Sequence, residues 1–280
     1  MSSIVKKRNP LLNGVIHIFL FLVFLFQVFP LVTLLVSTFR TDVELKNSPL
    51  GLPKSISFDN YLVTWVKGIY GRSYINSFFI GICVIFVVLT LACLAAYGLA
   101  RLQVPAKSFL TGYFTLGMSL PAFLYIVPLY YSFSKIGLIN NHLSLIIIYS
   151  ASYLPFSMLL IRTFLIGIPR ELEEAGMIDG CSELGVLWYV TIPLSIPIIT
   201  TAALVIFVWS WNEFMWANTF LTSDSLRTVS TRFYKFTSEY TRDISKIYTA
   251  GIISIFPIIF LYLCLQKSFI EGMTQGGLKG

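Results

Sequence analysis

The sequence predicts an all-α, polytopic membrane protein with six transmembrane helices and one short helix at the membrane surface. Hydrophobic residues make up 56% of the 280 residues, and charged residues make up only 12%. The mean hydropathy is +0.79, which is far outside the range of soluble domains. Long apolar runs recur along the chain, and a single acidic segment lies between two of them. We therefore expect one membrane domain over residues 1–280.

Six apolar runs are long enough to cross the hydrocarbon core of a bilayer. They cover approximately residues 14–39, 73–99, 108–133, 142–165, 196–221 and 248–269. The first run is too long for the core of a signal peptide, so it is expected to remain as a membrane helix. Pro121 and Pro128 predict bends in the third run. In the loop before the second run, residues 58–67 predict a short helix.

The acidic segment, residues 167–193, predicts a helix that lies outside the hydrocarbon core. Pro169 suits the first helical position, where its missing N–H group costs nothing. The helix dipole favours negative charge in the first turns. Three carboxylates lie there: Glu171, Glu173 and Glu174.

The second half of this segment predicts a turn and another short helix. Asp179 and Gly180 predict the end of the first helix, because Gly is the usual residue in the left-handed conformation after a helix. Ser182 predicts a cap for the second helix. The pair Ile192 and Pro193 predicts a break in the backbone before the next apolar run.

Composition and motifs exclude several classes of function. The sequence has no phosphate-binding loop, dinucleotide-binding glycine motif, zinc-protease motif or serine-hydrolase motif, and with only His17 and His142 a histidine-based catalytic or metal site is not expected. The four cysteines have no metal or redox spacing, so we expect free thiols. The net charge of +7 comes from residues spread among the loops, which favours contact with anionic lipid rather than nucleic acid.

The charge distribution gives a prediction for orientation. With the N-terminus inside, nine of the 20 Lys and Arg residues lie inside and eleven lie outside, so the count alone slightly opposes this orientation. However, the cluster Lys6, Lys7 and Arg8 abuts the first helix, which usually dominates. We therefore expect both termini to be cytoplasmic.

The acidic segment resembles a known signature. Glu174-Ala-Gly is followed by three residues, Gly180, nine residues, then Val190, one residue and Ile192-Pro193. This pattern is similar to the Glu-Ala-Ala signature of the membrane subunits of ATP-binding-cassette (ABC) importers, with conservative departures at Gly176, Val190 and Ile192. The motifs AAYGLAR (residues 95–101), WNEF (211–214) and GGLKG (276–280) extend the likeness to maltose-type carbohydrate permeases, and the last resembles the smaller of their two permease subunits.

This resemblance implies a type I ABC importer permease in a bacterial cytoplasmic membrane. It implies a heterodimer with a second homologous permease, two ATPase subunits that bind ATP and Mg, and an extracytoplasmic solute-binding protein. The chain itself is then not an enzyme and binds no cofactor. The acidic segment would be a coupling helix that docks on the ATPase. The implied coupling residues are Glu171, Glu174, Ala175, Gly176, Asp179 and Gly180.

Two further sets of residues are candidates for function. In maltose-type systems the C-terminus contacts the ATPase, which implies that role for the tail at residues 270–280 through Gly276, Gly277 and Lys279. Asn212 and Glu213 are candidates for the translocation path, since Glu213 is the only acidic residue in an apolar run and an intramembrane carboxylate is a functional candidate. The competing interpretation is that Glu213 reaches interfacial water. The main alternative function is a secondary transporter or channel, which should contain intramembrane ionisable pairs.

Overall fold

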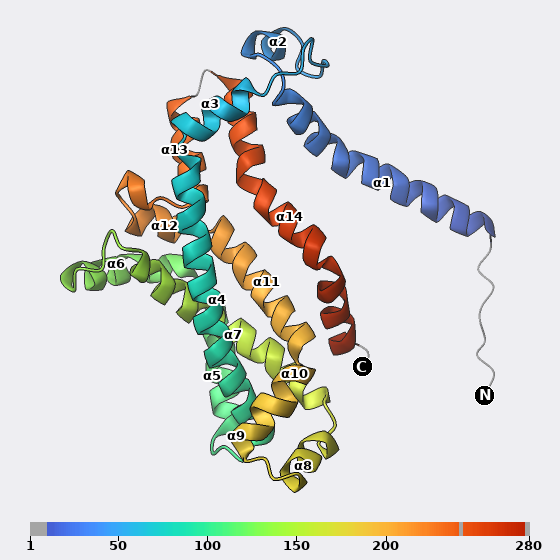
Figure 1. The fold of residues 1–280 in the computed structure, drawn as a ribbon, viewed down its shortest axis with the longest axis vertical. Coiled ribbons are helices and arrows are strands. Elements are labelled where there is room, and N and C mark those ends of the chain that lie inside the picture. The colour runs from blue at the N-terminus through green and yellow to red at the C-terminus, as the bar shows by residue number, and fades with distance from the viewer. Residues whose placement is uncertain (1–9, 241–242, 278–280) are drawn as a thin grey trace. The chain divides into compact units, whose positions relative to one another are not determined.

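The computed structural model describes residues 10–240 and 243–277 (Figure 1). All regular elements in these ranges are helical. The α-helices of the first half are α1 (Pro10–Ser37), α2 (Asp42–Asn47), α3 (Asp59–Lys67), α4 (Tyr70–Arg101), α5 (Lys107–Ser119), α6 (Ile126–Lys135) and α7 (His142–Gly167). Those of the second half are α8 (Glu171–Ile178), α9 (Glu183–Val186), α10 (Ile192–Leu194), α11 (Ile196–Asn212), α12 (Met215–Phe220), α13 (Val229–Glu239) and α14 (Ile244–Gly277). Two 3-10 helices, η1 (Ala122–Leu124) and η3 (Asp224–Leu226), and a π-helix, η2 (Leu187–Thr191), complete the set.

The chain forms two compact units. Unit 1 contains α1, α2, α3, the end of α13 from Phe236 and the first part of α14. Unit 2 contains α4 to α12, α13 as far as Lys235 and the part of α14 from Ile255. The prediction of one domain over the whole chain stays a prediction. The predicted helix at residues 58–67 is confirmed as α3.

Four of the predicted spans are continuous helices long and apolar enough to cross a membrane, namely those in α1, α4, α7 and α14. The fifth predicted span, residues 196–221, begins with α11, which forms a bent pair with the preceding residues 183–194 at an angle of 75°. The third is divided between α5 and α6, so the described residues do not confirm a count of six.

Proline explains the division of the third span. Leu120 has an extended backbone with φ −78° and ψ 119°, because the ring of Pro121 disfavours a helical conformation for the residue before it. The bend predicted at this proline is therefore confirmed. The bend predicted at Pro128 is wrong, because Pro128 lies in the first turn of α6, where no backbone donor is needed.

The core of unit 2 is built on one face of α4. Its buried residues recur every fourth position, which places them on one stripe of a helix. They are Ile80, Val84, Val88, Ala92, Ala96 and Ala100. The first three belong to a cluster with α7 and α12, and the three alanines belong to a second cluster with α7 and Leu187. Small side chains allow close approach between membrane helices, so α4 and α7 pack tightly along this stripe.

Buried polar contacts hold the N-terminal end of α4. Asn76 donates through Nδ2 to the carbonyl oxygens of Ser225 and Arg227, at 2.8 and 3.0 Å. The Oγ atom of Ser77 accepts from the backbone N–H of Val229 at 2.9 Å. Arg232 donates through Nε to Ser73 Oγ at 3.2 Å. The loop between α12 and α13 is therefore fixed to α4.

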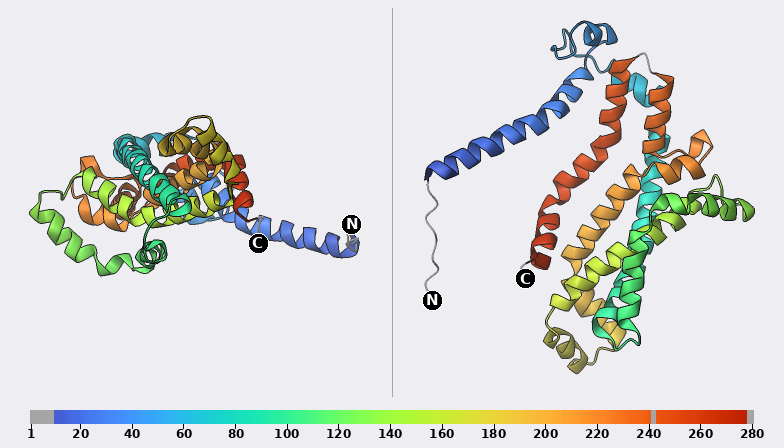
Figure 2. Two further views of the ribbon diagram at one scale, coloured as in Figure 1. Left: turned by 90° about the horizontal axis from the view of Figure 1, so that it is seen from below. Right: turned by 180° about the vertical axis from the view of Figure 1, so that it is seen from behind.

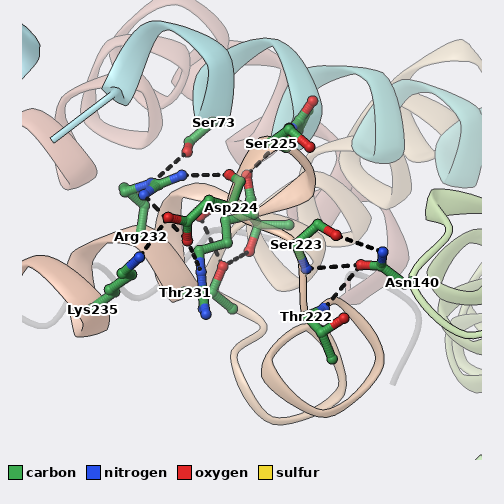
Figure 3. Close-up of polar contacts among 12 residues, drawn as sticks. Ser73, Asn140, Thr222, Ser223, Asp224, Ser225, Thr231, Arg232 and Lys235 are labelled. Carbon is green, nitrogen blue, oxygen red and sulfur yellow. Dashed lines mark hydrogen bonds and ion pairs between the residues drawn. The ribbon is translucent and has the colours of Figure 1, made fainter.

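The same loop carries a cluster of charges around Asp224 (Figure 3). Lys235 and Arg227 bond its carboxylate, and Arg232 lies 3.8 Å from it. The hydrogen bond from Lys235, followed by that from Arg227, lowers the pKa of Asp224. On the other side of the loop, Asn140 accepts from the backbone N–H groups of residues 222 and 223. The loop thus connects α4 to the α6–α7 turn.

We predict that Asn76→Ala destabilises unit 2. The change leaves two carbonyl groups without their donor in a buried site, and such a loss costs about 1–3 kcal/mol. Thermal unfolding of the purified protein in detergent should therefore begin at a lower temperature than for the wild type. Ser119→Ala is the matched control, because Ser119 is exposed and bonds only within its own helix. Equal unfolding temperatures for Asn76→Ala and the control would contradict this role of Asn76.

Candidate functional site

The acidic segment forms α8, at one end of unit 2. Figures 1 and 2 show α8 and α9 beyond the C-terminal end of α4. The helix begins at Glu171, two residues later than the position predicted from Pro169, and no side chain caps it. Three carboxylates in its first turn, the predicted Glu171, Glu173 and Glu174, stabilise it through the helix dipole.

The predicted stop at Gly180 is confirmed. Gly180 has φ +91°, and its N–H donates to Met177 O at 3.0 Å. A Cβ atom at this position would meet nothing within 4 Å, so the requirement for Gly is conformational rather than steric. The predicted cap is also confirmed, because Ser182 Oγ accepts from Gly185 N at 3.2 Å.

The predicted break before the apolar run is confirmed, but it lies two residues after the pair Ile192 and Pro193. The chain stays helical through Leu194, and the 75° bend follows at Ser195. A proline ring normally clashes with the carbonyl group four residues earlier, but here the wider π-helix η2 directly precedes it. Ser195 then bonds Thr191 O through both its N–H, at 3.0 Å, and its hydroxyl, at 2.7 Å.

Five of the six predicted coupling residues lie at the surface. These are Glu171, Glu174, Ala175, Asp179 and Gly180. Large apolar side chains are exposed beside them on the same helix, with exposed fractions of 45% for Leu172, 49% for Met177 and 85% for Ile178. We call these eight residues the α8 surface. Exposed apolar groups next to carboxylates on a short helix are typical of a surface that binds another protein.

The sixth predicted residue, Gly176, is buried. A Cβ atom here would lie 3.1 Å from Val190 Cγ2. Two departures from the ABC importer signature, Gly176 and Val190, thus face each other across the gap between α8 and η2. Gly176, which has no side chain, leaves room for the side chain of Val190.

Sequence reasoning missed the contact that joins α8 to the membrane helices. Glu173 is buried, with 5% of its surface exposed, and its Oε1 atom accepts from Arg101 Nε at 2.8 Å. The same oxygen accepts from Thr191 Oγ1 at 3.2 Å, and Arg101 Nη2 donates to Ile168 O at 2.9 Å. The available signal was the spacing, because Glu173 lies three residues before Gly176 and so shares its buried face, whereas Glu171 and Glu174 share another.

The candidate path residues lie where α11 ends. The structure ends this helix at Asn212, earlier than the predicted end near residue 221, because Glu213 is extended and a new helix, α12, follows. The Glu213 carboxylate accepts from the N–H groups of Trp216 and Ala217, at 3.0 and 3.1 Å, and from Tyr149 OH at 2.7 Å. Glu213 therefore caps α12. Asn212 is exposed and donates to Val208 O in its own helix.

The C-terminal residues are partly described. Helix α14 continues through Gly276 and Gly277, past the end predicted at residue 269, so the start of the predicted tail is helical. Lys279 lies outside the described residues. The predicted contact of these three residues with an ATPase stays a prediction.

Comparison with known families identifies the class of protein. The family model described as "Binding-protein-dependent transport system inner membrane component" matches residues 88–275. This match covers more than half of the chain, including α8 and the residues of the signature. The chain belongs to this family.

Curated relatives match over almost the whole length. The chain is 32% identical over 265 residues to YurM of Bacillus subtilis (strain 168), a probable ABC transporter permease, covering 95% of this chain and 88% of that protein. It is 31% identical to the trehalose/maltose transport system permease protein MalG of Thermococcus litoralis (strain ATCC 51850 / DSM 5473 / JCM 8560 / NS-C), covering all of both chains.

The fold is also similar to a solved structure. A bacterial ABC transporter involved in the import of the acidic polysaccharide alginate matches with a TM-score of 0.81 and 21% identity, over 96% of this chain and all of that chain. The architecture is therefore that of an ABC importer permease.

We predict that Glu213→Gln lowers stability. An amide keeps one acceptor oxygen but places an NH₂ group where the carboxylate accepts a second bond, and loss of a helix cap costs about 0.5–2 kcal/mol. Asn212→Ala is the neighbouring control, and surface changes of this kind usually stay within about 0.5 kcal/mol. The measurement is the unfolding temperature of each variant in the same detergent. If Glu213→Gln unfolds at the wild-type temperature, the capping role is wrong.

Proposed function

We propose that this chain is the membrane-spanning subunit of an ATP-driven importer for carbohydrates and that its α8 surface docks on a separate ATPase subunit. The observation that carries the proposal is α8 itself, an exposed acidic and apolar helix that bears the family's signature and is bonded through Glu173 to the end of α4. A helix with exposed apolar anchors can be received in a groove of a soluble partner.

Carbohydrate is the substrate class that the relatives support. Several are described as permeases for sugars, among them arabinooligosaccharides, diacetylchitobiose, and trehalose or maltose. Identities near 30% support the class but do not select one sugar. We propose that Asn212 and Glu213 lie near the translocation path. Glu213 would contribute by capping α12 and so fixing the position of that helix.

The proposed assembly contains a second homologous permease, two ATPase subunits and an extracytoplasmic solute-binding protein. ATP and Mg would bind to the ATPase subunits, and Gly276, Gly277 and Lys279 would contact them from the C-terminus. One solved relative is a complex with a pentasaccharide-bound periplasmic protein. The rival class, an ion-driven transporter, needs ionisable pairs within the membrane. In the described residues the buried pair Arg101 and Glu173 lies instead at the end of α4.

The proposal places α8 in the cytoplasm of a bacterial cell, together with both termini. A variant without the native cysteines can test this with one new thiol at a time. A cysteine at the exposed Ser55, in the loop after α2, should react with a membrane-impermeant maleimide added to intact cells. A cysteine at the exposed Glu183 should react only after the cells are opened. The reverse pattern would invert the topology.

We predict that Gly180→Val weakens docking while the membrane helices still assemble. A residue with a β-carbon is disfavoured in the left-handed conformation by about 1–2 kcal/mol, so the turn after α8 should shift. Uptake and substrate-stimulated ATP hydrolysis should fall together in vesicles with matched protein levels. Glu174→Ala, which removes one exposed carboxylate, should cause a smaller loss of both.

The control for this prediction is Gly137→Val. Gly137 has φ +71° and equally open surroundings, but it lies in the turn between α6 and α7, so it imposes similar strain away from α8. This control should keep the wild-type ATP hydrolysis per transporter. Full activity of Gly180→Val would remove the docking role from the α8 surface.

A further inference from the structure

The pair formed by Arg101 and Glu173 is unusual because it is both buried and shared by four segments. Each side chain is 7% exposed. The bonds of the pair reach the last residue of α4, the first turn of α8, the carbonyl group of Ile168 at the end of α7 and Thr191 in η2. Movement of α8 therefore acts directly on the end of α4.

Charge and geometry make this contact directional. A guanidinium group presents its donors in a fixed plane, and here two of them are used, toward Glu173 and Ile168. Charge-assisted hydrogen bonds are stronger than neutral ones and restrain angles as well as distances. An apolar contact of the same area would allow α8 to slide or tilt over α4.

Helix α4 is suited to carry such a displacement. It has 32 residues, which corresponds to a length of about 48 Å. The stripe that ends at Ala100 packs it against α7, and its other end is bonded to the α12–α13 loop through Asn76 and Ser77. Both ends of one helix are thus fixed by buried polar contacts, and Figure 3 shows the loop end.

We propose that Arg101 and Glu173 are positioning residues that transmit movement of α8 to α4 and, through α4, to the loop from Ser223 to Val229. This inference rests on the proposed docking of α8 to the ATPase. It adds that transport is coupled to ATP hydrolysis through one buried ion pair. The α8 surface supplies binding to the partner, and the pair supplies the connection to the membrane helices.

The test is the double variant Arg101→Met with Glu173→Met. Replacing both partners of a buried ion pair by apolar residues is often neutral for stability, whereas removing one leaves an unpaired charge. The complete transporter is reconstituted in vesicles with its ATPase, second permease and solute-binding protein. The transported probe is the one among trehalose, maltose, raffinose and arabinotriose that the binding protein retains.

The readout is the number of ATP molecules hydrolysed per sugar taken up. We expect the double variant to bind the ATPase and to hydrolyse ATP, while the ratio rises about tenfold, within the range of coupling between distant sites. Arg40→Met is the matched control, because it removes another buried arginine, whose hydrogen bonds reach the carbonyl groups of residues 44, 48 and 49 in unit 1 and not α4 or the loop from Ser223 to Val229. The control should lower uptake and hydrolysis in proportion.

Several results would overturn the proposal. A wild-type ratio in the double variant excludes the pair from coupling, and a proportional loss, as in the control, reduces it to a structural contact. If the double variant does not assemble, Arg101→Lys provides the second test. Lysine keeps the charge but not the planar pair of donors, so its ratio should rise by less than tenfold, and a wild-type ratio would again contradict the proposal.

The same experiment separates this inference from the docking proposal. Gly180→Val is assayed in parallel. If Gly180→Val is fully active while the double variant is uncoupled, the docking role of the α8 surface fails. If Gly180→Val is impaired while the double variant is normal, the docking role stands and the transmission through Arg101 and Glu173 fails.

Discussion

The constraint on which this structure depends is that backbone polar groups need partners where water is absent. Long helices meet this requirement within themselves, so the informative positions are those where a helix stops. At three of them a side chain bonds backbone groups close to the break. The Glu213 carboxylate accepts from N–H groups in the first turn of α12. The Ser195 hydroxyl donates to a carbonyl group at the bend before α11, and the Asn140 side chain accepts from an N–H group just after α12. Polar side chains thus support the backbone at these three breaks.

The same constraint explains why the ends of α4 contain buried charge. Arg101 would be costly to bury alone, but the Glu173 carboxylate and the Ile168 carbonyl group accept its hydrogen bonds. At the other end, Arg232 is 4% exposed and is satisfied by Ser73 and the Asp224 backbone. Between them the stripe of small and branched residues needs no polar partner. The helix is therefore held by packing along its length and by polar contacts at its ends.

The sequence predicted the features that follow from local chemistry. The turn at Gly180, the cap at Ser182 and the helix α3 depend on residues close in sequence, and the structure confirms them. The ABC importer signature also predicted the family. The break predicted at Pro193 lies two residues later, at Ser195. The π-helix before Pro193 accommodates the ring, a feature that depends on packing rather than on a proline rule.

Contacts between distant segments could not be predicted in the same way. Glu173 and Arg101 are separated by 72 positions, and although the spacing of Glu173 and Gly176 places them on one helix face, it does not indicate Arg101 as the partner of that carboxylate. The capping role of Glu213 depends on α11 ending at Asn212, which its apolar sequence does not indicate. An intramembrane carboxylate predicts that a special interaction exists, but the fold decides which one.

The central claim is that the α8 surface contacts an ATPase subunit. The most direct measurement places a photo-crosslinking amino acid at Ile178, the most exposed residue of α8 among the apolar ones, in cells that produce the complete transporter. The account predicts a crosslinked product that contains the ATPase subunit, and a product of lower yield when Gly180 is replaced by Val. Crosslinking of Ile178 to lipid or to the second permease, without the ATPase, would contradict the account.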